Sequence, residues 1–474
     1  MDINEFRTQG HRMVDWVADY LEGVDTRPVR AATPPGAVAA MLPEVAPESA
    51  EAWDTILADL DRVIMPGITH WQHPMFMAYF PCISSPPAIL AELIIGGLGV
   101  QGMMWETSPA ATELETRVLE WLARAMDLPP GLEGVIQDSA STSTLCAVLA
   151  AREAATAGAG NAQGGTAFAI LTAYASADAH SSVQKAMRIA GIGDAHFRAV
   201  ALTPDLAMDP AALDAAITRD RAAGLNPAII VATLGATGTG ANDDLDAIGA
   251  VAKRHGLWLH VDAAWAGNAL LLPEQRAMAR GLEAADSLVV NPHKWLYTGM
   301  DLSALYVKSP ALLERCFSIL PEYLRTAEEG VINYRDRGIT LGRRFRALKL
   351  WFVMRSYGLD GLRTELRRHI ALAHDLGARL EQEVDFEIMV PPRLALVVFR
   401  FRPMDMNETA LDAINENLLN ALNETGQIYL TRIRAGGHFA IRVSVGQTGV
   451  TSDHMDRAFR LITDTARTII SASS

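Results

Sequence analysis

Charged and hydroxyl-bearing side chains follow three apolar runs of the sequence at the points where those runs end. Asp262 follows one run, and the pair His293 and Lys294 follows the next. Thr237 lies in a glycine-rich turn after an earlier run. If the runs are neighbouring parallel strands, their carboxyl ends meet at one edge of a sheet, where α/β proteins bind ligands. A carboxylate and an ammonium group in one crevice are costly to bury alone, so we expect a ligand between them.

The aspartate and the lysine suit a ligand that offers a protonated ring nitrogen and a carbonyl group. Pyridoxal phosphate has both features, and its phosphate needs hydrogen-bond donors. Residues 137–142 (QDSAST) are predicted to open a helix, whose free N–H groups and partial positive charge favour phosphate. His180 follows another apolar run and could stack on the cofactor ring and contact a substrate carboxylate. The residues therefore predict a pyridoxal phosphate site.

Each of these motifs alone also fits a structural role. Asp262 could cap a helix, His180 could be a buried structural histidine, and the serine run could be a plain N-cap. From another functional class, residues 235–240 could suggest a nucleotide-binding oxidoreductase. Their pattern is GxxGxG instead of GxGxxG, and no acidic residue follows at the end of a second strand in the required register. A non-catalytic binding protein is a further alternative, which a colourless purified chain without cofactor uptake would support.

The composition limits the classes of partner. The chain of 474 residues has 41 Lys and Arg against 55 Asp and Glu, a net charge of −14, which argues against nucleic acid or an anionic membrane. Its cysteines, Cys82, Cys146 and Cys316, are far apart and form no metal-spaced cluster, which indicates reduced thiols in a cytoplasmic protein without a metal site. The most apolar stretch, 88–104, contains Glu92 and is shorter than the about 20 residues of a membrane span. We expect it to be buried or at a subunit interface.

The first part of the chain, residues 1–73, is expected to form helices joined by an extended connector. Apolar residues recur near helical spacing over 6–21, and closely spaced prolines exclude a helix over 28–47. A second helix is predicted over about 50–64. Because this segment has little core of its own, we expect it to pack on a partner subunit.

Residues 74–372 alternate between short apolar runs and helical periods, which predicts a mainly parallel sheet covered on both faces. The predicted strands include 168–171, 228–234, 257–261, 287–290 and 304–307, with a helix at 245–255 and a surface loop over 154–165. Residues 373–474 form runs of strands closed by helices, which indicates a separate small α+β domain. Its predicted strands are 386–390, 394–401, 429–433 and 439–445, and its predicted helices are 406–424 and 452–470.

Short motifs of one enzyme family recur along nearly the whole chain. They are EFR at 5–7, PGITHW at 66–71, AYFP at 78–81, SPA at 108–110, ELE at 113–115, DAHSS at 178–182, HVDAA at 260–264, NPHKW at 291–295 and LGRRF at 341–345. Through them the chain resembles the pyridoxal-phosphate-dependent group II decarboxylases, most closely the aromatic-L-amino-acid decarboxylases. The resemblance implies the α/β fold of fold-type I enzymes, with a large mainly parallel-sheet domain, an N-terminal helical strap and a small C-terminal α+β domain.

The resemblance also implies roles for the residues that match the family motifs. The implied catalytic residues are Lys294, which carries the cofactor, Asp262, which holds the ring nitrogen, His180, which stacks on the ring, and Tyr323, from the family's mobile catalytic loop. The implied cofactor-binding residues are Ser139, Ala140, Ser141, His180, Thr237, Asp262, Asn291, His293 and Lys294. The implied substrate side consists of Trp71, Tyr79, Phe80, Pro81, Cys82, Gln101, Met103 and Gly342. No metal ligand is implied.

The implied reaction is the decarboxylation of aromatic L-amino acids (Trp, Tyr, Phe or Dopa) to aromatic amines and carbon dioxide by a cytoplasmic homodimer. Tyr323 is the implied proton donor, with His180 as a second candidate. Two alternatives on the same fold stay open. One is an aromatic aldehyde synthase, against which Tyr323 argues because phenylalanine is usual there. The other is a decarboxylase of a different L-amino acid, such as His or Glu.

Several residues depart from the family pattern or affect the choice of substrate. Cys82 stands where relatives often have threonine, and Met103 stands where they often have phenylalanine. Asp138 replaces a small residue beside the phosphate run, so its carboxylate must point away or weaken binding. Gly342 leaves room that tends to go with indole substrates. Gln101 and Met103 are expected to reach across a dimer interface.

Overall fold

The computed structural model describes residues 1–319 and 330–473, which form two compact units. The large unit consists of residues 82–371, and the small unit combines residues 1–81 with the chain from Leu372 onward. Helix α14 (Ala347–Gln382) has a non-helical backbone at Gly358, where φ is +64° and ψ is 169°. The expected division into domains 1–73, 74–372 and 373–474 stays a prediction.

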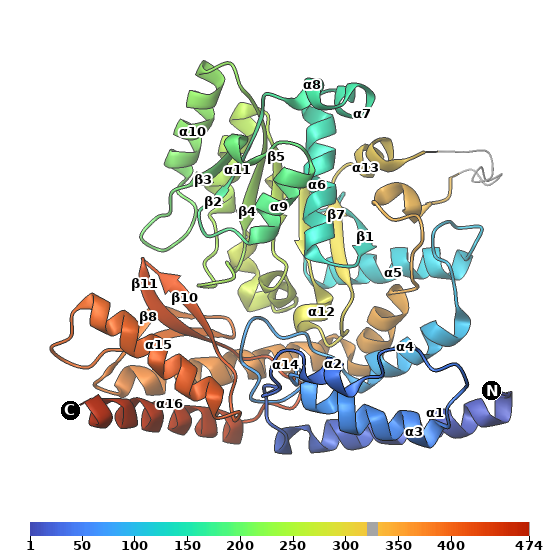
Figure 1. Ribbon diagram of the computed structural model, residues 1–474. Coiled ribbons are helices and arrows are strands. Elements are labelled where there is room, and N and C mark those ends of the chain that lie inside the picture. The colour runs from blue at the N-terminus through green and yellow to red at the C-terminus, as the bar shows by residue number, and fades with distance from the viewer. Residues whose placement is uncertain (320–329, 474) are drawn as a thin grey trace. The chain divides into compact units, whose positions relative to one another are not determined.

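A seven-stranded sheet forms the centre of the large unit, with the strand order β1-β7-β6-β5-β4-β2-β3 (Figure 1). The strands are β1 (Glu133–Gln137), β2 (Leu171–Ser176), β3 (Phe197–Val200), β4 (Asn226–Thr233), β5 (Trp258–Asp262), β6 (Ser287–Val290) and β7 (Ser303–Val307). β7 runs antiparallel to β1 and β6, and the other neighbouring pairs are parallel. β1 comes first in the chain but lies at the edge of the sheet, where Gln137 stands opposite Ser303 of β7. The predicted α/β fold with a mainly parallel sheet is confirmed.

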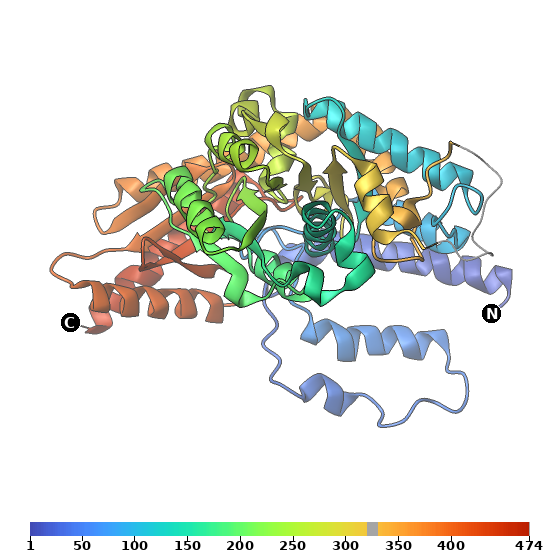
Figure 2. The ribbon, with the colours of Figure 1, turned by 90° about the horizontal axis from the view of Figure 1, so that it is seen from above.

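Helices cover this sheet, so most of its strands are buried from solvent. Every residue of β2, β5, β6 and β7 is buried, as expected for strands that are covered on both faces. Helix α6 packs against β4, β5, β6 and β7, and Figure 2 shows it end-on beside the strands. Helices α10 and α11 pack against each other and against β4. The helices are α4 (Pro86–Leu98), α5 (Pro109–Ala125), α6 (Ala140–Ala155), α7 (Ala159–Gln163), α8 (Gly165–Phe168), α9 (Ser181–Ile189), α10 (Pro210–Ala222), α11 (Leu245–His255), α12 (Pro292–Trp295) and α13 (Pro310–Phe317).

The small unit combines N-terminal helices with an antiparallel sheet of strand order β10-β11-β9-β8. Its strands are β8 (Phe386–Arg393), β9 (Leu396–Phe401), β10 (Thr431–Ala435) and β11 (His438–Ser444). Its helices are α1 (Ile3–Gly23), α2 (Ala37–Met41), α3 (Trp53–Asp59), α15 (Glu408–Glu424) and α16 (Ser452–Ser473). Helix α15 packs on β9 and β11, and the Asn415 amide bonds both backbone groups of Phe401, each at 2.7 Å. The Asp2 carboxylate caps α1 by accepting hydrogen bonds from the next turn.

Most predicted elements are confirmed. The predicted strand 287–290 coincides with β6, and the predicted helix 245–255 coincides with α11. The four strands and two helices predicted for the C-terminal residues are present, with ends shifted by a few residues. None of the helices in the described part of the chain combines the length and apolarity needed to cross a membrane.

Two local predictions are wrong, and a third differs only in the type of helix. The strand predicted from Phe168 begins only at Leu171, because Phe168 ends the short helix α8, where its ring lies 4.7 Å from the Arg152 guanidinium. The helix predicted over about 50–64 is present from Trp53 to Ile64, with a π-helical turn from Leu60 onward. The loop predicted over 154–165 contains helix α7.

Candidate active site

The three strand ends that carry the chemically interesting residues do meet. Strands β4, β5 and β6 are parallel neighbours, and their register places Thr233 beside Asp262 and Asp262 beside Val289. The backbone continues this ladder past the strand ends, because Leu234 N–H donates to the Asp262 carbonyl at 2.9 Å. The turn with Thr237, the Asp262 carboxylate and the helix with Lys294 therefore start from one edge of the sheet.

Asp262 is held at the end of β5 with only 7% of its surface exposed. One carboxylate oxygen accepts a hydrogen bond from the Ala264 backbone N–H at 3.1 Å, which fixes the side chain toward the strand end. The buried Asn268 amide donates to the carbonyls of Trp265 (2.8 Å) and Asn291 (3.1 Å), so it ties the loop after β5 to the residue after β6. Sequence reasoning missed Asn268, because nothing but its place among apolar residues marks it.

Lys294 and His293 lie on the short helix α12, which begins directly after β6. The His293 Nδ1 accepts a hydrogen bond from the Leu302 backbone N–H at 2.9 Å, so the neutral ring carries its proton on Nε2. Burial and the neighbouring Lys294 ammonium lower the pKa of His293 to about 4. His293 is therefore a neutral hydrogen-bond donor at pH 7.

His180 caps helix α9 after strand β2. Its Nδ1 accepts from the Ser182 backbone N–H at 3.2 Å and lies 2.7 Å from the Ser182 hydroxyl, which leaves the proton of the neutral ring on Nε2. Burial lowers the pKa of His180, while the Asp262 carboxylate raises it and the Lys294 ammonium lowers it. Because β2 runs parallel to β4, His180 starts from the same edge of the sheet as Asp262 and Lys294.

The start of helix α6 offers hydrogen-bond donors for an anion. Ser139 is the N-cap, and its hydroxyl accepts from the Thr142 N–H at 3.3 Å. The first bond along the helix runs from Ser143 N–H to the Ser139 carbonyl, so the N–H groups of Ala140 and Ser141 precede the helical ladder. The Ser139 hydroxyl also lies 3.0 Å from the Asp138 carboxylate. The negative charge of Asp138 thus stands beside the predicted phosphate donors.

The turn that contains Thr237 is tightly constrained at its first residue. Gly235 has φ +75°, and a Cβ there would lie 2.4 Å from the Ala266 Cβ, so only glycine fits. Its N–H donates to the Asn242 side chain at 2.8 Å. The buried Asp243 carboxylate accepts from the Thr233 N–H at 2.7 Å, and burial raises its pKa to about 6. Sequence reasoning missed Asp243, which fixes the end of β4 before the turn.

Asn291 provides the test of whether this site fits a phosphorylated cofactor. The residue is 2% exposed, and its Oδ1 is buried without a hydrogen-bond partner among the described residues. A buried amide atom without a partner indicates a missing group, and a rotated amide would present its N–H donors instead. Together with the start of α6, the Lys294 amine and the Asp262 carboxylate, this amide fits a ligand with a phosphate, a carbonyl and a ring nitrogen.

Four residues predicted for the substrate side belong to the large unit. Gln101 accepts from the Arg343 backbone N–H at 2.6 Å, and a Cβ at Gly342 would lie 3.3 Å from the Gln101 side-chain nitrogen. The Met103 carbonyl accepts from the Arg335 backbone N–H at 3.0 Å. Gln101 and Gly342 therefore lie side by side, and the expectation that Gln101 and Met103 reach across a dimer interface stays a prediction.

Cys82 is the fourth of these residues and lies within electrostatic range of Lys294. Burial raises the pKa of the Cys82 thiol, and the Lys349 and Lys294 ammonium groups lower it. Lys349 itself is 1% exposed and forms an ion pair with Glu92 at 2.8 Å. The large unit thus places Cys82 near the lysine that is predicted to carry the cofactor.

The other four predicted substrate residues belong to the small unit, where Trp71 and Tyr79 form an aromatic cluster with Tyr429, which sequence reasoning missed. Trp71 stacks on Tyr79 with ring centroids 5.7 Å apart, and the Tyr79 and Tyr429 hydroxyls are 3.4 Å apart. Tyr79 is 49% exposed, whereas Phe80 is 8% exposed, and Pro81 is buried as well. Tyr323, the predicted proton donor, lies outside the described residues.

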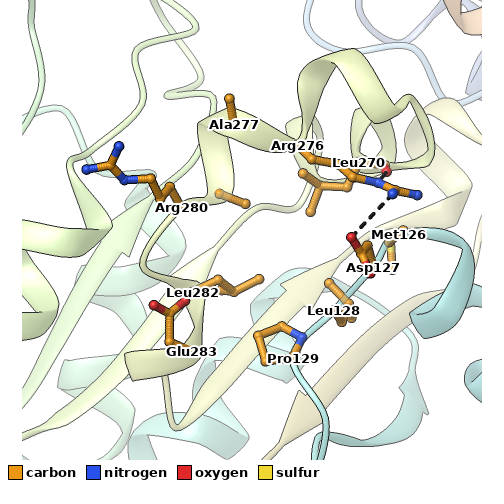
Figure 3. Close-up of a pocket in the computed structure, with 11 residues that line it drawn as sticks. Met126, Asp127, Leu128, Pro129, Leu270, Arg276, Ala277, Arg280, Leu282 and Glu283 are labelled. Carbon is orange, nitrogen blue, oxygen red and sulfur yellow. Dashed lines mark hydrogen bonds and ion pairs between the residues drawn. The ribbon is translucent and has the colours of Figure 1, made fainter.

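A separate cavity of about 270 Å³ lies in the large unit beside the residues that follow α5 (Figure 3). Its Arg276 forms an ion pair with Asp127 at 3.3 Å and donates to the carbonyls of Ala125 (3.0 Å) and Leu270 (3.3 Å). None of the predicted site residues lines it. Over residues 1–319 and 330–473, no group of three or more His, Cys, Asp or Glu side chains could hold a metal ion.

Comparisons with known proteins identify the family of this chain. The family model of the pyridoxal-dependent decarboxylase conserved domain matches residues 35–402. Aromatic-L-amino-acid decarboxylase of Rattus norvegicus is 40% identical, with 100% of this chain and 99% of that protein covered. Phenylacetaldehyde synthase of a Rosa hybrid cultivar is 39% identical, with 99% and 96% covered.

Solved structures are similar over the same length. The Oryza sativa TDC structure with PLP and tryptamine has a TM-score of 0.96 at 35% identity, with 99% of both chains covered. Catharanthus roseus tryptophan decarboxylase in complex with L-tryptophan has a TM-score of 0.93 at 38% identity, again with 99% of both chains covered.

Proposed function

The chain belongs to the pyridoxal-dependent decarboxylase family, takes pyridoxal phosphate as its cofactor and is a carboxy-lyase, and from this premise we propose that it converts aromatic L-amino acids into aromatic amines and carbon dioxide. The observation that supports this proposal is that the parallel strands before His180, Asp262 and Lys294 all end at one edge of the sheet. The aromatic substrate class is supported by relatives that match over their full length and act on aromatic compounds according to their names.

We assign each residue of the site a role in holding the cofactor. Lys294 provides the amine for the carbonyl, and Asp262 keeps a proton on the ring nitrogen through a charge-assisted hydrogen bond. His180 stacks on the ring, and Thr237 contacts the side that carries the ring hydroxyl. The proposed phosphate residues are Ser139, Ala140, Ser141, Asn291 and His293. The neutral Nε2–H of His293 and the N–H groups at the start of α6 are suited to this task.

The protein then controls where protons and charges go during the reaction. When bound, pyridoxal phosphate supplies a carbonyl that amines attack and a ring that accepts the electron pair left by departing carbon dioxide. His180 is neutral at pH 7 because its pKa is lowered, so its Nε2–H can orient the substrate carboxylate without a full positive charge. We assign Tyr323 the proton that is added to the α-carbon. Such fixed donors and charges are usually the largest catalytic contribution.

Tryptophan, tyrosine, phenylalanine and Dopa are the proposed substrates, and the space at Gly342 favours the larger rings. A Cβ at this position would lie 3.3 Å from the Gln101 side-chain nitrogen, so glycine lets the Gln101 side chain lie close to the backbone here. We propose that Gln101, Met103, Cys82 and Gly342, with Trp71, Tyr79, Phe80 and Pro81, receive the aromatic ring.

An assay of the purified enzyme with a panel of L-amino acids tests the proposal and separates it from the alternatives. We expect amine and carbon dioxide in equal amounts from aromatic substrates and no turnover of Glu or His.

An aldehyde synthase is the second candidate, because a phenylacetaldehyde synthase is 39% identical to this chain. If Tyr323 is the proton donor, Tyr323→Phe should suppress amine and divert the reaction to dioxygen, which oxidises the decarboxylated substrate so that aldehyde, ammonia and hydrogen peroxide are released instead. Unchanged amine formation by Tyr323→Phe would contradict that role, and aldehyde from the unmodified enzyme would favour the second candidate.

We propose that the enzyme works as a homodimer in the cytoplasm. Within the large unit, helix α4 exposes a row of apolar side chains, which marks an interaction surface. They are Leu90 (48% exposed), Leu93 (55%), Ile94 (41%) and Leu98 (58%). The cytoplasmic location rests on the use of cysteine, since Cys82, Cys146 and Cys316 are free thiols.

Replacing Asp138 with alanine should tighten cofactor binding. The Asp138 carboxylate lies beside the N-cap of α6 and repels the cofactor phosphate. We expect the dissociation constant of pyridoxal phosphate to fall about fivefold, since one such repulsion is worth about 1 kcal/mol in water-accessible surroundings. Titration of the apoenzyme with pyridoxal phosphate, followed by protein fluorescence at low and high salt, measures it. Asp360→Ala removes the same charge from a fully accessible side chain. An equal effect of both variants would contradict the local explanation.

A further inference from the structure

In the small unit, the segment of residues 75–81 forms backbone hydrogen bonds with Tyr429 and with the end of strand β11. Met77 N–H donates to the Tyr429 carbonyl at 3.0 Å, and Tyr429 N–H donates to the Met75 carbonyl at 3.2 Å. Ser444 N–H, at the end of β11, donates to the Met77 carbonyl at 2.9 Å. The last three residues of this segment, Tyr79, Phe80 and Pro81, are proposed substrate residues.

The backbone of Tyr79 adopts an unfavourable conformation. Its φ of +49° lies in the left-handed region, where a side chain with a Cβ is sterically disfavoured. The turn that results leaves the Tyr79 ring 49% exposed and stacked on Trp71, while the next ring, Phe80, is only 8% exposed. Such a conformation persists only where surrounding contacts hold it in place.

Arg442 of strand β11 supplies contacts to both residues. Its Nη1 donates a hydrogen bond to the Tyr79 carbonyl, and its guanidinium carbon lies 4.4 Å from the centre of the Phe80 ring. One side chain therefore holds the strained peptide of Tyr79 and the face of Phe80 at the same time. A planar guanidinium is suited to this, because it can donate in its plane and stack on its face.

The same side chain is a poor contributor to stability. Arg442 is 3% exposed, and its Nε and Nη2 have no hydrogen-bond partner among the described residues. Burial lowers its pKa to about 9. Arg400 on the neighbouring strand β9 is 4% exposed as well, but it forms ion pairs with Glu387 (2.6 Å) and Glu408 (2.7 Å). A buried cation with unmet donors is unfavourable for folding, which points to a functional reason for Arg442.

We infer that Arg442 is a positioning residue that fixes the Tyr79 backbone and the Phe80 ring and thereby sets the affinity for aromatic substrates. The inference rests on the proposed function, in which Tyr79 and Phe80 receive the substrate ring. Arg442 itself acts through these two residues. Loss of its guanidinium frees the Tyr79 peptide to relax and removes the support behind the Phe80 ring, so substrate binding weakens while the reacting groups stay in place.

Steady-state kinetics and melting curves of three variants of the cofactor-loaded enzyme test this inference. For Arg442→Met we expect KM for aromatic substrates to rise about tenfold, equivalent to about 1.4 kcal/mol, with little change in kcat and no fall in melting temperature. Arg442→Lys keeps a donor for the Tyr79 carbonyl, so its KM should lie between those of Arg442→Met and the unmodified enzyme. The matched control Arg400→Met should lower the melting temperature and leave KM unchanged.

Near-ultraviolet circular dichroism adds a readout that does not need turnover. The stacked Trp71 and Tyr79 rings should lose signal in Arg442→Met and keep it in Arg400→Met. An unchanged KM and unchanged signal in Arg442→Met would overturn the inference. If Arg442→Met does not fold, an unchanged KM in Arg442→Lys overturns it instead. If the unmodified enzyme releases no aromatic amine, the proposed function fails, and the dichroism signal alone then decides the positioning role.

Discussion

Replacing Lys294 with alanine is expected to lower the rate of carbon dioxide release by on the order of a thousandfold or more, as removal of a covalently acting residue usually does. Lys294 lies on α12 directly after β6, close enough to His180 to influence its pKa. In its proposed role, Lys294 would attach the cofactor covalently, so its removal should abolish that attachment. Binding through the phosphate residues should remain.

Borohydride reduction measures the attachment directly. In the unmodified enzyme, reduction should fix the cofactor on the peptide that contains Lys294, and in Lys294→Ala no peptide should carry it. Lys308→Ala is the matched control, because this exposed lysine follows the adjacent strand β7 and donates to the Glu283 carbonyl. A labelled peptide elsewhere in the chain, or full activity of Lys294→Ala, would refute the assignment.

Replacing Asp262 with asparagine should be the second most damaging change, lowering kcat roughly 10²- to 10³-fold, as expected for the loss of one preorganised electrostatic group. The amide keeps the size of the carboxylate and can still accept from the Ala264 N–H. It cannot hold a proton on the ring nitrogen, because a neutral amide gains nothing from the positive charge. The fold should therefore persist while the chemistry fails.

Stopped-flow absorbance of the bound cofactor together with the melting temperature tests this prediction. Asp286→Asn is the matched control, since Asp286 precedes β6 at the opposite end of the strands and accepts from the Leu259 N–H at 2.8 Å. We expect the control to change stability without changing the cofactor spectrum. If Asp286→Asn were as inactive as Asp262→Asn, the proposed role of Asp262 at the ring nitrogen would be lost.

The amino-acid sequence was sufficient to predict the buried strands of the sheet, but it was not sufficient to predict the edge strand β3. Strand β6 was predicted with its observed bounds, because a strand covered on both faces reads as one uninterrupted apolar run. Strand β3 was missed, because it is a short edge strand with only one buried residue. Phe168 was assigned to a strand because its apolar side chain cannot by itself distinguish a strand from a short buried helix.

The same distinction holds for the candidate site. Asp262 and Lys294 could be found, because each directly follows an apolar run and so must lie at a strand end. The sequence could not predict the roles of Asn268, Asp243 and Tyr429. These residues belong to no motif, and they matter because of contacts with residues elsewhere in the sequence. Arg442 was invisible for the same reason, since Tyr79 stands 363 positions away in the chain.

The place of β1 in the sheet has a consequence for biosynthesis. Among the described residues, β1 pairs only with β7, which is the last strand of this sheet to leave the ribosome. Gln137 of β1 lies opposite Ser303 of β7. In a nascent chain that ends before Ser303, β1 has no partner strand. Helix α6, which follows β1, then begins after a strand that is not yet part of the sheet. Such long-range pairing slows folding and exposes unpaired edges while translation proceeds. We therefore expect vitamin B6 to be captured only after β7 (Ser303–Val307) has emerged, which is well before the end of the 474-residue chain.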